Sequence, residues 1–208
     1  DLMSSALNVN GMLWRTCPSC TELELSVLDW LRDGMGLPGE FFGFLCDTAS
    51  VSSMLSLAAA REAADPEVRL LGMAGSADLK PYRDYASDQA HSSIAKACVT
   101  LGLGIDGFRG IAHDDDYRMD VAALEAAIAK DRASGTRPLA VVATVGTTST
   151  TSVDPVAAIG EICRREGLWF HVDAAYAGSA AICPEHQWIF DGAENVDSLV
   201  FNPHKWLF

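Results

Sequence analysis

Short apolar runs alternate with helical stretches along most of this chain, and this alternation restricts the fold more than any other feature. Residues 139–145 read LAVVATV, β-branched and apolar throughout, as expected of a strand buried on both faces. Strands that alternate with helices of about 10–15 residues form βαβ units. We therefore predict an α/β fold, with a mostly parallel sheet that carries helices on both faces.

The expected elements follow from hydrophobic spacing and from capping residues. Ser19 and Glu22 have the spacing of a capping box, Asp120 is placed to cap a helix, and Asp154 with Pro155 forms an N-cap followed by an N1 proline. We expect strands at 41–45, 68–73, 82–87, 107–112, 139–145, 168–172 and 198–201, and helices at 20–33, 51–64, 91–103, 121–133 and from 155 to about 166.

No repeat, low-complexity tract or linker interrupts this alternation, so no boundary is expected inside the α/β region. We expect an N-terminal helical segment at residues 1–35 and a large domain at residues 36–208. The chain starts inside an Ala/Leu-rich stretch of helical character. The expectation is therefore that the helical segment is incomplete at its start.

The charge balance argues against nucleic-acid and membrane-surface binding. The chain has 15 Lys and Arg against 28 Asp and Glu, a net charge of −13, which repels phosphate groups and anionic lipids. No apolar stretch reaches the roughly 18–20 residues of a membrane span, and no secretory signal is visible. We expect a cytoplasmic protein.

Six cysteines in 208 residues are too few for a disulfide scaffold. Cys17 and Cys20 have the spacing of a redox or zinc pair, but no second pair completes a four-ligand site. We expect structural thiols and no metal.

Ligands of open α/β sheets bind beyond the carboxyl ends of the strands, which selects segments 47–50, 87–92, 146–149, 173–176 and 202–205. Lys205, one of only four lysines, follows an expected buried strand in an apolar setting. Desolvation favours a neutral amine, the form that attacks a carbonyl to make an imine. The alternative is a lysine that extends from a sheet edge into solvent.

Asp173 stands at the end of an apolar strand and is followed by small residues. A carboxylate there needs a cationic partner, and small neighbours leave room for a flat ligand. A lysine imine combined with an aspartate at a pyridinium nitrogen is what pyridoxal phosphate chemistry requires. The alternatives are an N-cap aspartate or a metal pair with His171.

Three further segments offer groups for such a ligand. Thr48, Ala49 and Ser50 open a helix, where backbone N–H groups and hydroxyls bind phosphate, although the segment also reads as an ordinary cap. The hydroxyl-rich loop 146–149 also reads as a turn. His91 lies at a strand-to-helix junction, where a histidine also serves as a cap or core residue.

Together these segments resemble a known family. The stretches are YASDQAHSS at 85–93, ATVGTTS at 143–149, HVDAAYAGSA at 171–180 and FNPHKWL at 201–207, with CTELE at 20–24. They resemble the pyridoxal-phosphate group II decarboxylases, specifically the aromatic-L-amino-acid decarboxylase branch, over nearly the whole chain. The resemblance implies the large domain of fold type I pyridoxal phosphate enzymes, a homodimer, and decarboxylation of aromatic L-amino acids to aryl-ethylamines.

The resemblance also implies roles for single residues. Lys205 would carry pyridoxal 5'-phosphate as an imine, Asp173 would hold the pyridinium proton, and His91 would stack on the ring. Contacts to the cofactor would come from the remaining site residues: Ala175 on the other ring face, Thr148 beside the ring, His204 facing it, and Thr48, Ala49, Ser50 and Asn202 at the phosphate.

The sequence departs from the family beyond Lys205. Relatives carry a loop tyrosine and a small C-terminal domain downstream, whereas three residues follow Lys205 here, so a central fragment is expected. The alternatives are an aromatic acetaldehyde synthase, a histidine or glutamate decarboxylase, a non-catalytic fragment or pseudoenzyme, and a metal hydrolase that uses His171 and Asp173. Met12, Leu13 and Trp14 lie where relatives form part of the substrate pocket, across the dimer interface.

Overall fold

The computed structural model describes residues 2–74 and 80–207, except the side chain of Ser4. The chain divides into two compact units, Asp1–Leu45 and Cys46–Phe208, and each is described by itself. The expected boundary between residues 35 and 36 stays a prediction. Among the described residues, no helix has the length and apolar character needed to cross a bilayer.

The first unit consists of α1 (Leu2–Leu7), α2 (Pro18–Gly34) and an irregular segment. The predicted helix at 20–33 is confirmed, but the capping box is wrong: Pro18 starts the helix and Cys17 is its N-cap, without a side-chain cap bond. A proline suits the first helical position because the N–H it lacks would have no partner there. The helix therefore begins before Ser19 can cap it.

The predicted strand at 41–45 is wrong, because this segment forms no strand. Phe42 and Phe44 are 77% and 58% exposed. The Leu45 N–H donates to Glu24 Oε1 at 2.8 Å, where a strand would donate to a neighbouring strand. An apolar run of this length does not form a strand unless a partner strand lies beside it.

The second unit is built on a five-stranded sheet in the order β2-β1-β3-β4-β5, with all neighbouring strands parallel. This confirms the predicted α/β class. The strands are β1 (Tyr82–Ser87), β2 (Phe108–Ile111), β3 (Arg137–Thr144), β4 (Trp169–Ala174) and β5 (Ser198–Phe201).

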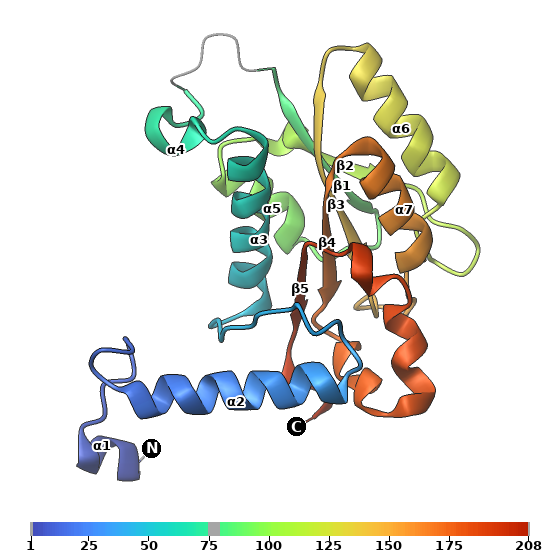
Figure 1. Cartoon of the computed structure of the whole chain (residues 1–208). Coiled ribbons are helices and arrows are strands. Elements are labelled where there is room, and N and C mark those ends of the chain that lie inside the picture. Colours follow the sequence, from blue (N-terminus) through green and yellow to red (C-terminus); the bar gives the residue numbers. More distant parts are fainter. Residues whose placement is uncertain (1, 75–79, 208) are drawn as a thin grey trace. The chain divides into compact units, whose positions relative to one another are not determined.

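Helices cover both faces of this sheet. In Figure 1, α3 and α5 lie on one face and α6 and α7 on the other. The α-helices are α3 (Ala49–Ala64), α4 (Val68–Leu71), α5 (Ser93–Thr100), α6 (Val121–Ala133), α7 (Val156–Glu166) and α8 (Pro203–Trp206), and the 3₁₀ helices are η1 (Ile105–Gly107), η2 (Gly178–Ile182), η3 (Pro184–Phe190) and η4 (Ala193–Asn195).

The predicted strand at 68–73 is wrong, since these residues form the short helix α4. A turn at Asp65 starts it, because the Val68 N–H donates to the Asp65 carbonyl at 3.1 Å. Gly72, with φ of +65°, ends it. Short apolar runs fit a strand and a buried helix equally well. Here the turns at Asp65 and Gly72 favour a short helix.

The two faces of the sheet are packed differently. The α3/α5 face carries an apolar cluster that includes Leu57, Ile94 and Val142, and it also buries Asp84 and His171. On the other face the buried Asp131 of α6 accepts a 2.8 Å hydrogen bond from the Tyr85 hydroxyl and pairs with Arg109 at 2.9 Å. The buried carboxylate is therefore satisfied, as a buried charge must be.

Asp154 does not cap α7 as expected. Pro155 occupies the N-cap position, and the buried Asp154 carboxylate accepts backbone N–H groups from Met119 and Thr144, each at 2.7 Å. Burial raises its pKa to about 6, against the opposing effect of these two bonds. Asp154 thus fixes the end of β3, which the local sequence pattern cannot show.

Asp154→Ala is expected to lower the free energy of unfolding by about 2–5 kcal/mol, because two buried N–H groups lose their acceptor. Urea unfolding of the chain measures this loss. Asp115→Ala, at an exposed aspartate in the same region, is the control and should change stability by less than about 0.5 kcal/mol. Equal effects of the two substitutions would contradict the assigned role of Asp154.

Asp84 of β1 makes the stability of this unit depend on pH. It is fully buried, and burial raises its pKa from 3.8 to about 7, against the hydrogen bonds from Cys98 and the Ala140 backbone. The native state therefore keeps a proton that the unfolded chain loses at lower pH. The protonated form stabilises the fold below the unfolded pKa, and this stability is lost as pH rises from about 4 to about 7.

Asp84→Asn removes this titration. Between pH 5 and pH 8 the wild type is expected to lose about 3 kcal/mol more of its unfolding free energy than the variant. His171, whose pKa burial lowers to about 4, has the opposite sign and is present in both proteins, so it cancels in the difference. Denaturant titrations at both pH values test this, and parallel pH profiles would contradict it.

Candidate active site

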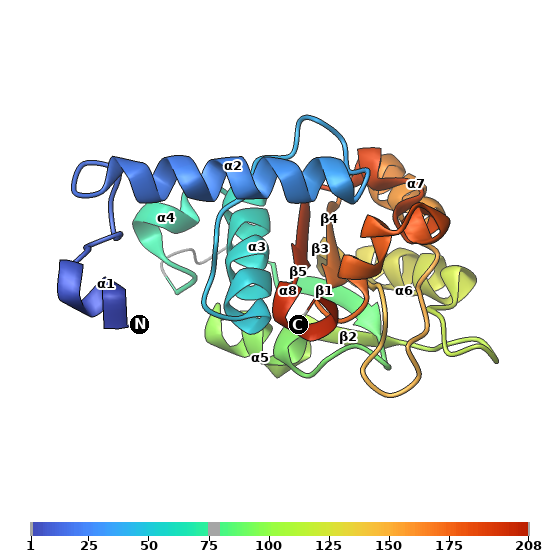
Figure 2. The same ribbon diagram turned by 90° about the horizontal axis from the view of Figure 1, so that it is seen from below.

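The expected site lies at the carboxyl edge of the sheet in the second unit. Strands β1, β3, β4 and β5 are parallel and end at this edge, and α3 starts there (Figure 1). Figure 2 views the unit from this edge, with α8 in front of the strand ends. The topology thus brings segments from residue 48 to residue 205 to one edge of the sheet.

Asp173, one residue before the end of β4, carries a buried carboxylate and is 6% exposed. Its Oδ1 accepts a 3.1 Å hydrogen bond from the Ala175 N–H, and its backbone carbonyl accepts the Val145 N–H at 2.9 Å. None of the described residues forms an ion pair with it. A buried carboxylate without a cation is costly, so this position suits a positively charged ligand group.

His171, two residues earlier on β4, has a structural role. Its Nδ1 shares a 2.9 Å hydrogen bond with the Ser198 hydroxyl, and its Nε2 shares one of 3.2 Å with the Ser53 hydroxyl. Burial lowers its pKa to about 4, so the ring is neutral at physiological pH. Both nitrogens are engaged, which leaves neither to join Asp173 as a metal pair. Through these two hydrogen bonds, His171 links β4 to α3 and to β5.

The start of α3 offers an anion site of the expected kind. Thr48 is the N-cap, and its hydroxyl accepts the Val51 N–H at 3.3 Å. The first N–H groups of a helix have no acceptor within the helix, which leaves those of Ala49 and Ser50 for a ligand. Ser50 is exposed, so a phosphate could reach it. The Ser53 contact to His171 fixes this helix end against the strands.

The loop after β3 is held rigid by a glycine and by hydroxyl groups. Gly146 has φ of +85°, and a Cβ there would collide with Ala177. The buried Thr147 hydroxyl contacts the Thr150 hydroxyl at 2.7 Å and the Ser152 hydroxyl at 2.9 Å. Thr148, next to it, is exposed. The loop therefore leaves Thr148 exposed, while the hydroxyl of Thr147 holds the turn in place.

His91 lies between β1 and α5 and is exposed. Its Nδ1 accepts the Ser93 N–H at 3.2 Å and lies 2.9 Å from the Ser93 hydroxyl. With Nδ1 as an acceptor of a backbone N–H, a neutral ring carries its proton on Nε2. These contacts fix the orientation of the imidazole while leaving the ring accessible.

Lys205 does not lie in the apolar setting that the sequence suggested. It belongs to the short helix α8, and both Lys205 and His204 are exposed. The Lys205 Nζ lies 5.8 Å from the centre of the Tyr176 ring, and Trp206 contacts the same ring edge to face at 5.2 Å. The described residues therefore do not bury this amine. Asn202 is the N-cap of α8.

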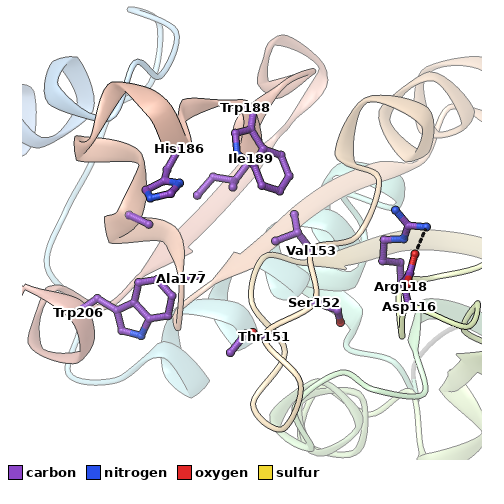
Figure 3. Close-up of a pocket in the computed structure, with 11 residues that line it drawn as sticks. Asp116, Arg118, Thr151, Ser152, Val153, Ala177, His186, Trp188, Ile189 and Trp206 are labelled. Atoms are coloured by element: carbon purple, nitrogen blue, oxygen red, sulfur yellow. Dashed lines mark hydrogen bonds and ion pairs between the residues drawn. The ribbon is translucent and has the colours of Figure 1, made fainter.

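A cavity of ≈ 420 Å³ lies beside these residues (Figure 3). It is lined by Trp188 and Ile189 of η3, by Trp206, and by the loop around Val153. Figure 3 shows the Arg118–Asp116 pair at its other side. None of the residues expected to hold the cofactor lines it. Sequence reasoning missed this cavity because its walls come from separate segments.

Residues Met12, Leu13 and Trp14 belong to the first unit, where they are 75%, 54% and 56% exposed. Their expected role in a substrate pocket stays a prediction.

Comparisons with known proteins agree with the motifs. The family model described as the pyridoxal-dependent decarboxylase conserved domain matches residues 1–208. Aromatic-L-amino-acid decarboxylase of Bos taurus is 42% identical over 100% of this chain and 44% of its own length. Phenylacetaldehyde synthase of Arabidopsis thaliana is 40% identical over 99% of this chain and 42% of its own length.

Among solved structures, Oryza sativa TDC with PLP and tryptamine has a TM-score of 0.90 and 42% identity, and the match covers 100% of this chain and 44% of that one. The chain thus spans less than half the length of the relatives it matches.

Proposed function

This chain belongs to the pyridoxal-dependent decarboxylase family, and from that premise we propose that the protein carrying it decarboxylates aromatic L-amino acids to aryl-ethylamines and CO₂. The observation that carries the proposal is the buried Asp173 carboxylate, which has no cationic partner among the described residues and lies near the carboxyl end of β4.

The residues at this edge fit pyridoxal 5'-phosphate. Asp173 matches a protonated pyridine nitrogen, the free N–H groups at the start of α3 match a phosphate, and Lys205 supplies a primary amine. When bound, the cofactor supplies an electron-withdrawing ring that accepts the electron pair released as CO₂ departs. The negative charge of Asp173 keeps the proton on the ring nitrogen, which sustains that capacity.

The remaining residues position the ring and its phosphate. We assign His91 to one ring face and Ala175 to the other, and Thr148 to a place beside the ring. Thr48, Ala49, Ser50 and Asn202 would hold the phosphate. His204 would face the cofactor next to Lys205. His91 is suited to its role because the Ser93 contacts fix its ring plane.

A second candidate is aromatic acetaldehyde synthesis on the same cofactor, since one relative at 40% identity is a phenylacetaldehyde synthase. Mass spectrometry of the products separates the two. The full-length protein that carries this chain is incubated with Trp, Tyr, Phe, dihydroxy-Phe, His and Glu. The proposal expects amines from aromatic substrates. Aldehyde with hydrogen peroxide would favour the second candidate, and turnover of His or Glu alone would exclude both.

We further propose that the protein acts as a homodimer in the cytoplasm. The resemblance to the group II decarboxylases, for which a homodimer is usual, supports the dimer. Light scattering of the full-length protein tests it, and a monomer with full activity would contradict it.

A further inference from the structure

Two cysteines at the start of α2 are not among the residues assigned to the cofactor. Cys17 is the N-cap of this helix, Pro18 occupies its first turn, and Cys20 follows one turn later. The two Sγ atoms lie 2.9 Å apart and share a hydrogen bond. Both side chains are half-buried, so small molecules can reach them. The spacing alone fits structural thiols. The short distance between the two sulfur atoms indicates in addition that they can react with each other.

The geometry is close to that of a disulfide. An S–S bond is about 2.05 Å long, so the sulfurs need to approach by only about 1 Å. Residues three apart in the first turn of a helix lie on one face, so the approach does not require the helix to unwind. Two thiols this close together can be joined by oxidation to a disulfide.

The two thiols are not equivalent. Hydrogen bonds from Cys20 and then Ser19 lower the pKa of Cys17, whereas the same contact raises the pKa of Cys20. The N-terminal end of a helix also favours a thiolate. Burial raises the pKa of Cys98 and of Cys163, which makes those thiols inert. Cys17 is therefore the expected nucleophile and Cys20 the resolving thiol.

We propose that Cys17 and Cys20 form a reversible dithiol–disulfide site that exchanges with small-molecule disulfides. The Cys17 thiolate attacks one sulfur of the reagent RSSR, whose S–S bond breaks and releases RS⁻. Cys20 then attacks Cys17 Sγ and releases the second RS⁻. The two protein thiols are oxidised, RSSR is reduced to two RSH, and the protons of the two protein thiols end on the two RSH molecules.

Formation of the disulfide is expected to affect only the start of α2. The disulfide closes a loop of very few residues, and such small loops remove little entropy from the unfolded chain. Oxidation should fix the first turn of α2 and leave the stability of the second unit unchanged. The proposal does not depend on the proposed function, because it concerns residues of the first unit alone.

The test uses the reduced full chain, oxidised glutathione at pH 7, and mass spectrometry of the tryptic peptide Thr16–Arg32, which holds no other cysteine. The expected result is a peptide lighter by two hydrogens, restored by dithiothreitol. Under limiting iodoacetamide, Cys17 should alkylate at least about ten-fold faster than Cys183, which is an exposed single thiol in the same chain.

Two variants assign the roles. Cys20→Ser should accumulate a glutathione adduct at Cys17, and Cys17→Ser should react no faster than Cys183. Peptide Thr16–Arg32 that stays fully reduced while Cys183 becomes glutathionylated would overturn the proposal. So would equal alkylation rates of Cys17 and Cys183.

Discussion

Replacing Asp173 by asparagine is expected to lower kcat of the full-length protein that carries this chain by roughly 10²–10⁴-fold. Removing one partner of a buried ion pair costs about 3–5 kcal/mol, and each 1.4 kcal/mol or so is a factor of about ten in rate. An asparagine in this place cannot hold a proton on the ring nitrogen. Steady-state kinetics at saturating pyridoxal phosphate measure the loss.

Asp173→Asn removes the negative charge of this side chain and is expected to leave the surrounding structure unchanged. The asparagine Oδ1 can still accept the Ala175 N–H that Asp173 accepts at 3.1 Å, so the end of β4 should keep its conformation. Asp106→Asn, at an exposed aspartate in η1, is the matched control and should retain full activity. Wild-type kcat in Asp173→Asn would rule out the role given to this carboxylate.

The second large effect is expected at Lys205. Lys205→Ala removes the primary amine that attaches the cofactor, so activity should fall by about 10⁴-fold or more, and the absorbance band of the lysine-bound cofactor should disappear. The Lys205 side chain is exposed, so the fold should change in stability by less than about 0.5 kcal/mol. Lys205→Arg keeps the positive charge without the amine and should be equally inactive.

Lys130→Ala, at an exposed lysine of α6, serves as the control with normal absorbance and activity. An intact absorbance band in Lys205→Ala would refute the assignment of Lys205.

The regular part of the fold could be predicted because local signals coincide with long-range packing there. β1, β5 and α6 have the predicted bounds, and Asp120 caps α6 by accepting the Ala122 and Ala123 N–H groups. The segments 41–45 and 68–73 carry the same kind of apolar run but have no strand beside them. A strand forms only where another strand can hydrogen-bond to it, and a short stretch of sequence does not show whether such a partner lies beside it.

Two features near the candidate site agree with the sequence pattern. Asp173 is buried at the end of β4 and Thr48 caps α3, as expected. The links between distant segments could not be predicted: Ser53 with His171, and Asp154 with Thr144. The exposure of Lys205 was missed for a related reason, since the strand pattern describes β5 but not what covers α8.

The most direct test of the account is to trap the cofactor on the protein. The full-length protein is incubated with pyridoxal phosphate, reduced with borohydride, digested and mapped by mass spectrometry. The cofactor mass is expected on the peptide that contains Lys205, and on none of the peptides with Lys80, Lys96 or Lys130. Labelling of another lysine in place of Lys205, or no stable labelling at all, would contradict it.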